Sequence, residues 1–248
     1  PCAAAQPAAP AATDFDHSVA TAWFDQILEL IRATPGFSPP VAARALGYAG
    51  VTLYEAVAPG TAGAHSLAGQ VNGLSALPQI EAGAVYHWPT VANSALAGIT
   101  RRLFAGAGEP QRAAIDGLEI SHRKRFAPTL APDVLRRSVH YGRLVAAAIF
   151  AWSRTDGGHE GYMFNVPTDF VAPIGAGLWE STPPAYLSPL QPHWGENRPF
   201  VLENGATCAP PPPPAYSTDP ASPMFQEATE LYTTVKDLTP EQREIALF

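Results

Sequence analysis

The densest cluster of side chains that could do chemistry is Asp156-Gly157-Gly158-His159-Glu160. An aspartate, a histidine and a glutamate within five residues could hold a divalent cation or move a proton. The two glycines would instead end a preceding helix, and the polar side chains would then bind the amides of the following loop. We favour this structural interpretation and keep Asp156, His159 and Glu160 as the alternative metal ligands.

Two other pairs have a spacing that could bind an ion. Glu119 and His122 lie three residues apart, as in one half of a helical metal site, but the second half-site is missing, so we expect a solvated helix face. Lys236 and Arg243 have the separation of an oxyanion-binding pair, but Pro240 begins a helix between them. The sequence contains no nucleophile elbow, phosphate-binding glycine loop, dinucleotide fingerprint or HExxH motif. We therefore predict no catalytic residue in this chain.

The elements that would position these groups are helices. Apolar residues recur at helical spacing in five segments before residue 155, and prolines mark several of their first turns. The segments are about 17–33, 38–57, 89–104, 110–126 and 132–154, with shorter helices near 66–71, over 223–235 and from 240. In the second of them, the predicted buried stripe is Ala42, Leu46, Ala49, Leu53 and Val57. No strand is expected, and the predicted fold is an all-α helical bundle.

A long segment rich in proline, glycine and tryptophan interrupts the helices. Its aromatic content favours an ordered loop over a disordered one. We divide the chain into a flexible N-terminal tail (1–14), a helical platform (15–155), a long wrapping loop (156–222) and the start of further helices (223–248). The last helix has no C-cap and an apolar final turn, so we expect the domain to continue beyond it.

Composition narrows the class of protein. The chain has 248 residues, a net charge of −7 and a pI of about 5.4, which does not favour nucleic acid as a partner. No apolar run approaches the roughly 20 residues of a membrane span. The N-terminus is rich in Ala and Pro and has no initiator Met, as in a secreted or periplasmic chain whose signal peptide has been removed. In that compartment Cys2 and Cys208 could form a disulfide, with two free thiols as the alternative.

Three short patterns in the loop resemble a known family. They are G-x-W-x-x-T-P-P-A-Y at Gly177–Tyr186, P-x-W-G at Pro192–Gly195 and R-P-F-x-L at Arg198–Leu202. The sequence resembles the bacterial vanadium-dependent haloperoxidase-like proteins of the type 2 phosphatidic acid phosphatase superfamily, over about residues 15–248. The resemblance implies an α-helical bundle enzyme that binds vanadate and oxidises halide with peroxide, or binds phosphate in the phosphatase relatives. It also implies that Trp179, His193 and Arg198 lie at the rim of the substrate pocket.

The family's oxyanion-binding motifs are absent from this sequence. It contains no Ser-Gly-His, and its Lys236-x6-Arg243 pair lacks the proline that follows in the family. The resemblance therefore concerns the N-terminal half of such a protein. Vanadate or phosphate would bind only in the complete protein, and this chain alone is expected to bind neither and to be inactive. The expected partner is the missing C-terminal half or another subunit docking on 223–248, and a homo-oligomer is a further option. The alternative is a non-enzymatic helical module for structure or assembly.

Overall fold

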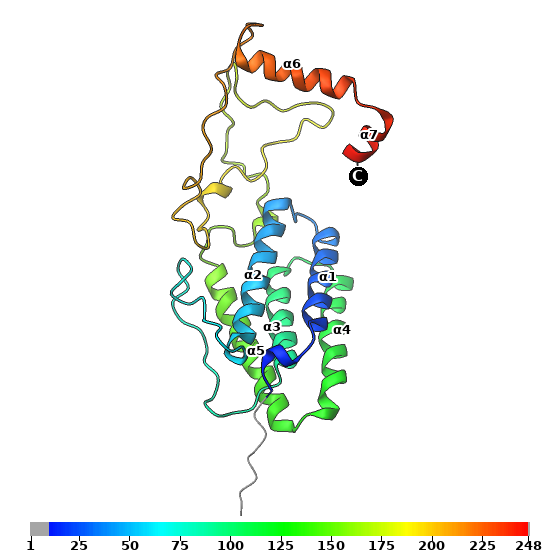
Figure 1. Cartoon of the computed structure of the whole chain (residues 1–248), viewed down its shortest axis with the longest axis vertical. Helices are drawn as coiled ribbons and strands as arrows, with labels where there is room; N and C mark the ends of the chain where they lie inside the picture. The colour runs from blue at the N-terminus through cyan, green and yellow to red at the C-terminus, as the bar shows by residue number, and fades with distance from the viewer. Residues whose placement is uncertain (1–9, 248) are drawn as a thin grey trace, which may run out of the picture. The chain divides into compact units, whose positions relative to one another are not determined.

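The computed structural model describes residues 10–247, and over that range it is all-α, with no strand. The longer helices are α1 (Ser18–Ala33), α2 (Pro39–Val57), α3 (Trp88–Leu103), α4 (Glu109–Phe126), α5 (Pro132–Ser153), α6 (Pro223–Lys236) and α7 (Pro240–Leu247) (Figure 1). The predicted all-α fold is confirmed. None of the helices within residues 10–247 is both long and apolar enough to cross a bilayer.

The chain forms two compact units. Among the described residues, the first contains 10–167 together with Leu190–Thr207, and the second contains Thr168–Pro189 and 208–247. This division falls inside the segment 156–222, which the sequence analysis treats as one wrapping loop. Residues 156–167 and 190–207 of that segment belong to the unit that contains α1 to α5, and residues 168–189 and 208–222 belong to the other unit.

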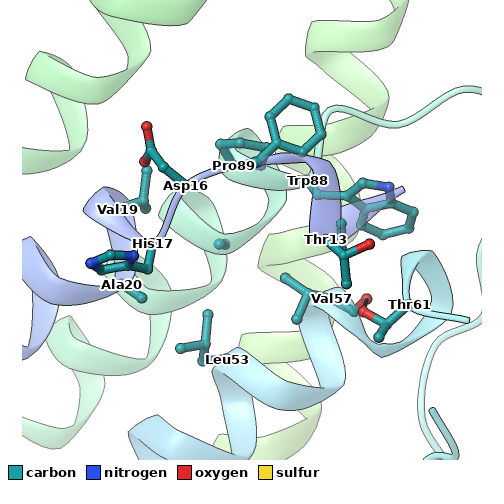
Figure 2. Close-up of a pocket in the computed structure, with 13 residues that line it drawn as sticks. Thr13, Asp16, His17, Val19, Ala20, Leu53, Val57, Thr61, Trp88 and Pro89 are labelled. Carbon is teal, nitrogen blue, oxygen red and sulfur yellow. Dashed lines mark hydrogen bonds between the residues drawn. The ribbon is translucent and has the colours of Figure 1, made fainter. Parts of the chain in front are cut away.

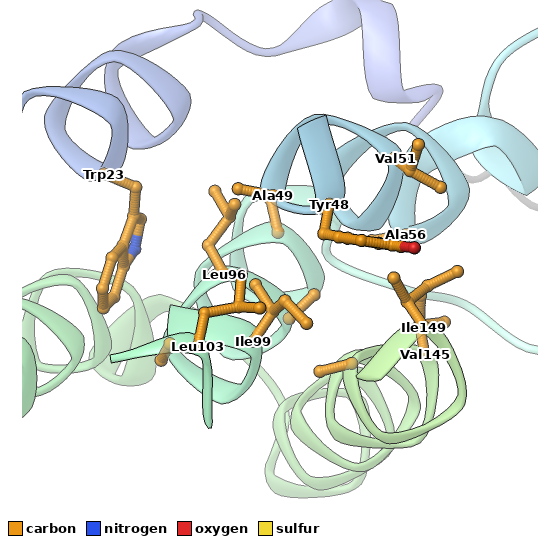
Figure 3. Packing of buried hydrophobic residues seen from close by; sticks show 14 of the residues in the cluster. Trp23, Tyr48, Ala49, Val51, Ala56, Leu96, Ile99, Leu103, Val145 and Ile149 are labelled. Carbon is orange, nitrogen blue, oxygen red and sulfur yellow. The ribbon is translucent and has the colours of Figure 1, made fainter. Parts of the chain in front are cut away.

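Helix α3 is the centre of the first unit. Every residue of this helix except Arg101 and Arg102 is buried, because α1, α2, α4 and α5 all pack against it. A helix that is apolar or small on all sides is stable only when it is covered on all sides. Figure 3 shows Leu96 and Ile99 of α3 pointing into a core that they share with Tyr48 of α2 and Val145 of α5.

Small residues bring α3 and α5 unusually close together. A Cβ atom added to Gly142 of α5 would lie 2.4 Å from the carbonyl oxygen of Val91, and one added to Gly98 of α3 would lie 2.8 Å from the Cβ of Ala146. At this close approach, the hydroxyl of Ser94 donates to the carbonyl of Val139 at 2.9 Å. The spacing of these two helices therefore depends on glycine.

One buried polar side chain connects three helices. Asn93 of α3 accepts a hydrogen bond from the indole N–H of Trp23 in α1 at 2.9 Å. Its amide group donates to the backbone carbonyl of Glu119 in α4 at 3.1 Å. Both polar ends of Asn93 thus have partners, as burial requires.

The predicted buried stripe of α2 is wrong for most of its members. Ala49 is buried as expected, but Leu46, Leu53 and Val57 are only half-buried. The helix buries a neighbouring face that carries polar groups, namely Val41, Ala45, Tyr48, Ala49, Val51, Thr52, Glu55 and Ala56. The hydrophobic pattern could not reveal this face, because its polar residues are buried through specific hydrogen bonds.

The connection between α2 and α3 supplies some of those bonds. The hydroxyl of Ser66 and the amide of Leu67 donate to the Glu55 carboxylate at 2.9 and 2.5 Å. The short helix predicted near 66–71 is wrong, since these residues form turns. The turns present donors to Glu55.

The second unit contains α6 and α7, neither of which has a buried residue. Both helices begin where the sequence predicts. The hydroxyl of Ser222 accepts from the amide of Phe225 at 3.2 Å, and Thr239 and Gln242 exchange side chain to backbone bonds at 2.9 and 3.2 Å. Each helix therefore begins at a capped residue.

Candidate functional site

The carboxylate of Asp156 is the centre of a buried polar network in the first unit. It accepts from Nε and Nη2 of Arg44 at 2.7 and 3.0 Å, from the hydroxyl of Tyr48 at 2.8 Å and from the amide of Gly158 at 2.8 Å. The side chains of Arg44 and Asp156 are only 10% and 4% exposed. Four donors therefore occupy the two carboxylate oxygens.

Two helices and a tight turn build this network. Arg44 and Tyr48 lie one turn apart on α2 and so face the same way. Helix α5 ends at Ser153, whose carbonyl accepts from Nη2 of Arg44 at 2.6 Å. Gly157 then turns the chain with a φ of 97°, which favours glycine. Burial, and next the negative charge of Asp156, raise the pKa of Tyr48, so its hydroxyl stays protonated and donates.

His159 and Glu160, the other two candidate metal ligands, have different neighbours from Asp156. The ring of His159 packs edge-on against Phe150 with centroids 5.7 Å apart, and its Nε2 lies 3.8 Å from the carboxylate of Glu160. Within residues 10–247, no three His, Cys, Asp or Glu side chains are arranged to hold a metal ion. His159 and Glu160 therefore lie next to each other, whereas the Asp156 carboxylate is bonded to Arg44, Tyr48 and Gly158.

A cavity of about 320 Å³ lies beside the network. Arg44 and Asp156 contribute to its wall, and most of the remaining wall comes from two of the three loop motifs that carry the resemblance, P-x-W-G and R-P-F-x-L. The principal loop residues are Trp194, Asn197, Arg198, Phe200 and Leu202. The cavity thus joins a buried ion pair to an aromatic and aliphatic wall.

Arg198 is fixed against the end of α5. Its Nη1 donates to the hydroxyl of Thr155 at 2.8 Å, its Nη2 donates to the carbonyl of Trp152 at 2.8 Å, and the guanidinium lies 5.3 Å from the Trp152 ring centroid. Its Nε and the amide nitrogen of Asn197 are buried and have no hydrogen-bond partner among the residues described. Two unsatisfied donors therefore sit in the residues that line this cavity.

The other two predicted rim residues are not among those that line this cavity. His193 is exposed, with its Nδ1 3.2 Å from a carboxylate oxygen of Glu196. Trp179 belongs to the second unit and is also exposed. Of the three, only Arg198 contributes to the cavity beside Asp156. For the predicted disulfide, Cys208 is exposed and Cys2 lies outside the described residues.

A second cavity of about 370 Å³ was not predicted from the sequence. Figure 2 shows it between the segment that precedes α1, the side of α2 at Leu53 and Val57, and the start of α3 at Trp88. Two of its polar residues already have structural roles. Asp16 accepts from the amide of Ser18 at 2.9 Å, and the indole N–H of Trp88 donates to the carbonyl of Pro10 at 3.0 Å. This cavity offers mainly an apolar wall and no convergent set of reactive groups.

The two sequence pairs that could bind an ion do not form such sites. Glu119, whose side chain is 16% exposed, bonds to Arg101 at 2.5 Å, and His122 is buried and stacked on Phe126. The expected solvated face is therefore wrong for this pair. Lys236 and Arg243 are both exposed, and Nη2 of Arg243 lies 3.5 Å from the Lys236 carbonyl oxygen.

No protein-family model and no curated protein matches the sequence. A solved structure does match, a crystal structure of what is described as the first bacterial vanadium-dependent iodoperoxidase, with a TM-score of 0.75 and 32% identity. The fold of the chain is haloperoxidase-like. The predicted similarity to bacterial vanadium-dependent haloperoxidases is therefore confirmed. The match covers 90% of this chain and 51% of that one, so the haloperoxidase-like chain spans about half the length of the iodoperoxidase.

The residues of the haloperoxidase-like chain do not fit vanadate through the motifs that the family uses. Ser-Gly-His is absent, and the one pair with Lys-x6-Arg spacing lies exposed at the end of α6 and in α7. Oxyanion binding of that kind needs several guanidinium and amide donors directed at one point. We therefore assign no vanadate ligand to these residues.

Proposed function

We propose that this chain is the helical platform of a vanadium-dependent haloperoxidase-like enzyme, and that vanadate or phosphate binds to the other half of such a protein. The similarity to the iodoperoxidase carries this proposal, since it extends over 90% of this chain but only 51% of that protein. The absence of the oxyanion-binding motifs from the sequence supports it. Alone, the chain would have neither peroxidase nor phosphatase activity.

In this proposal the buried network around Asp156 holds a loop that borders the substrate pocket. Arg44 and Asp156 fix the end of α5, and Arg198 is bound to the same end through the Trp152 carbonyl. The loop that carries Arg198 is then positioned by a rigid helical unit. Trp179 and His193 remain proposed rim residues, and they would reach the pocket when the other half is present.

We also propose that the protein is secreted or periplasmic, as the sequence analysis expects. A secreted or periplasmic protein would allow a Cys2–Cys208 disulfide. Mass spectrometry of the unreduced chain tests this bond, because its formation lowers the mass by two hydrogen atoms. Two alkylatable thiols in the native protein would exclude it.

The deciding experiment measures the intact mass and the vanadate binding of the polypeptide from its native source. We expect a species much heavier than 26.2 kDa that binds vanadate saturably, whereas the 248-residue chain alone does not. A native polypeptide of 26.2 kDa that never binds vanadate or phosphate would overturn the proposal.

A non-enzymatic assembly module is the second candidate. The observation in its favour is that α6 exposes Leu231, Tyr232 and Val235, and α7 exposes Ile245 and Leu247. Apolar helix faces in water usually mark a contact with a partner. In that case a native chain of 26.2 kDa would form a stable oligomer, and Leu231→Glu would dissociate it in sedimentation experiments.

A further inference from the structure

Helices α4 and α5 border a groove whose polar lining is basic. A cavity of about 260 Å³ in this groove is lined by Arg123 of α4 and by Arg136, His140 and Arg143 of α5. The α5 residues are spaced by four and then three positions, so they lie on one face of the helix. Leu135 and Val139 complete the lining with aliphatic surface.

The positive charge of this groove is poorly compensated. No carboxylate lines the cavity, and Arg123, Arg136 and His140 have no acidic partner among residues 10–247. The nearest acid to Arg143 is Glu119 at 4.0 Å, and that carboxylate is already bonded to Arg101. A chain with a net charge of −7 thus gathers three guanidinium groups around one small cavity. Guanidinium groups that line one cavity repel each other, and an anion bound between them would offset this repulsion.

The types of donor point to a particular anion. A guanidinium group presents a planar fork of N–H donors that matches two oxygens of a phosphate. Three such forks and an imidazole offer more donors than a single carboxylate can accept. The volume also leaves room for a small carbon skeleton, which could lie against Leu135 and Val139.

We propose that the groove between α4 and α5 binds a phosphate monoester or a phospholipid headgroup through Arg123, Arg136 and Arg143. The phosphate oxygens accept from the guanidinium groups, and the carbon skeleton covers the aliphatic wall. This site is independent of the proposed haloperoxidase-like function, because its phosphate-binding groups are exposed arginines of this chain and belong to none of the family's oxyanion motifs.

The test titrates the 248-residue chain with inorganic phosphate and with glycerol phosphate at low ionic strength. Calorimetry and the NMR chemical shifts of arginine Nε–H groups measure the binding. We expect saturable binding, and Arg136→Gln should weaken it roughly tenfold, as for the loss of one charge-assisted hydrogen bond. Arg154→Gln is the matched control, because Arg154 is an exposed arginine directly after α5 that does not line the groove. Both variants change the net charge equally.

A second arm separates the two sources of phosphate. The chain is sedimented with vesicles of neutral phospholipid alone and with vesicles that also contain phosphatidylglycerol. Binding to the mixed vesicles that Arg136→Gln abolishes and Arg154→Gln keeps indicates a lipid headgroup, whereas binding of only the soluble phosphates indicates a free metabolite. If no probe binds saturably, or if both variants weaken binding equally, the proposal is wrong.

Discussion

Replacing Asp156 by asparagine tests whether the buried ion pair between Asp156 and Arg44 stabilises the fold. The change keeps the shape of the side chain but removes the charge that compensates Arg44, whose side chain is only 10% exposed. Removing one partner of a buried pair costs about 3–5 kcal/mol. Because the asparagine carbonyl can still accept from Tyr48 or Gly158, we expect the lower end of this range, about 3 kcal/mol.

Thermal and urea unfolding, followed by circular dichroism, measure this cost. One kcal/mol shifts the Tm of a unit of this size by about 2–4 °C, so Asp156→Asn should lower it by roughly 6–12 °C. Adding Arg44→Met removes the uncompensated charge, and the double variant should therefore lose at least about 1 kcal/mol less than the sum of the two single variants.

The matched control is Asp116→Asn. Asp116 pairs with Arg101 at 2.6 Å, but this pair is largely exposed, with side-chain exposures of 58% and 38%. An exposed pair contributes at most about 1 kcal/mol. If Asp156→Asn destabilises the protein no more than Asp116→Asn does, the reasoning about the buried network is refuted.

Three further predictions concern the helical core. Asn93→Ala leaves the buried indole N–H of Trp23 without its acceptor and should cost about 1–3 kcal/mol in urea unfolding. Gly142→Ala forces α3 and α5 apart and should lower the free energy of unfolding by about 1–3 kcal/mol. Gly117→Ala, with open space around its Cβ, should be neutral or stabilising. Equal effects of the two variants would contradict the close packing of α3 and α5. Burial lowers the pKa of His122, so the unfolded chain binds more protons, and the free energy of unfolding should fall between about pH 7 and 5. His122→Phe should flatten that pH dependence, and an unchanged slope would assign it to other groups.

The helix boundaries could be predicted because their signals are local. Prolines in the first turns and Gly36 after the first helix mark ends that the structure reproduces within a residue or two. Local signals did not reveal which hydrogen bonds the side chains at the helix ends make. The hydroxyl of Ser38 does not cap α2 but donates to the side chain of Asn165 at 2.6 Å, a residue 127 positions away.

The candidate site was harder to predict because its partners are distant in sequence. Arg44 and Asp156 are 112 residues apart, and neither has a pattern around it that indicates the other. The same pairing hid the buried face of α2, since Tyr48 is a polar residue whose burial depends on Asp156. Hydrophobic periodicity detects only burial that needs no partner.

The burial of α3 has a consequence for synthesis on the ribosome. All but two residues of α3 are buried in the folded unit, and α5 buries many of them. The ribosome completes α5 only at Ser153. At typical translation rates of about 5–20 residues per second, the nascent α3 waits several seconds for α5 to be completed. The surface of α3 that meets α5 contains Ser94 and Gly98. Until α5 covers it, this surface therefore exposes less apolar area than a leucine-rich face would. A larger apolar residue at Gly98 would therefore increase aggregation of the nascent chain as well as disturb packing in the finished protein.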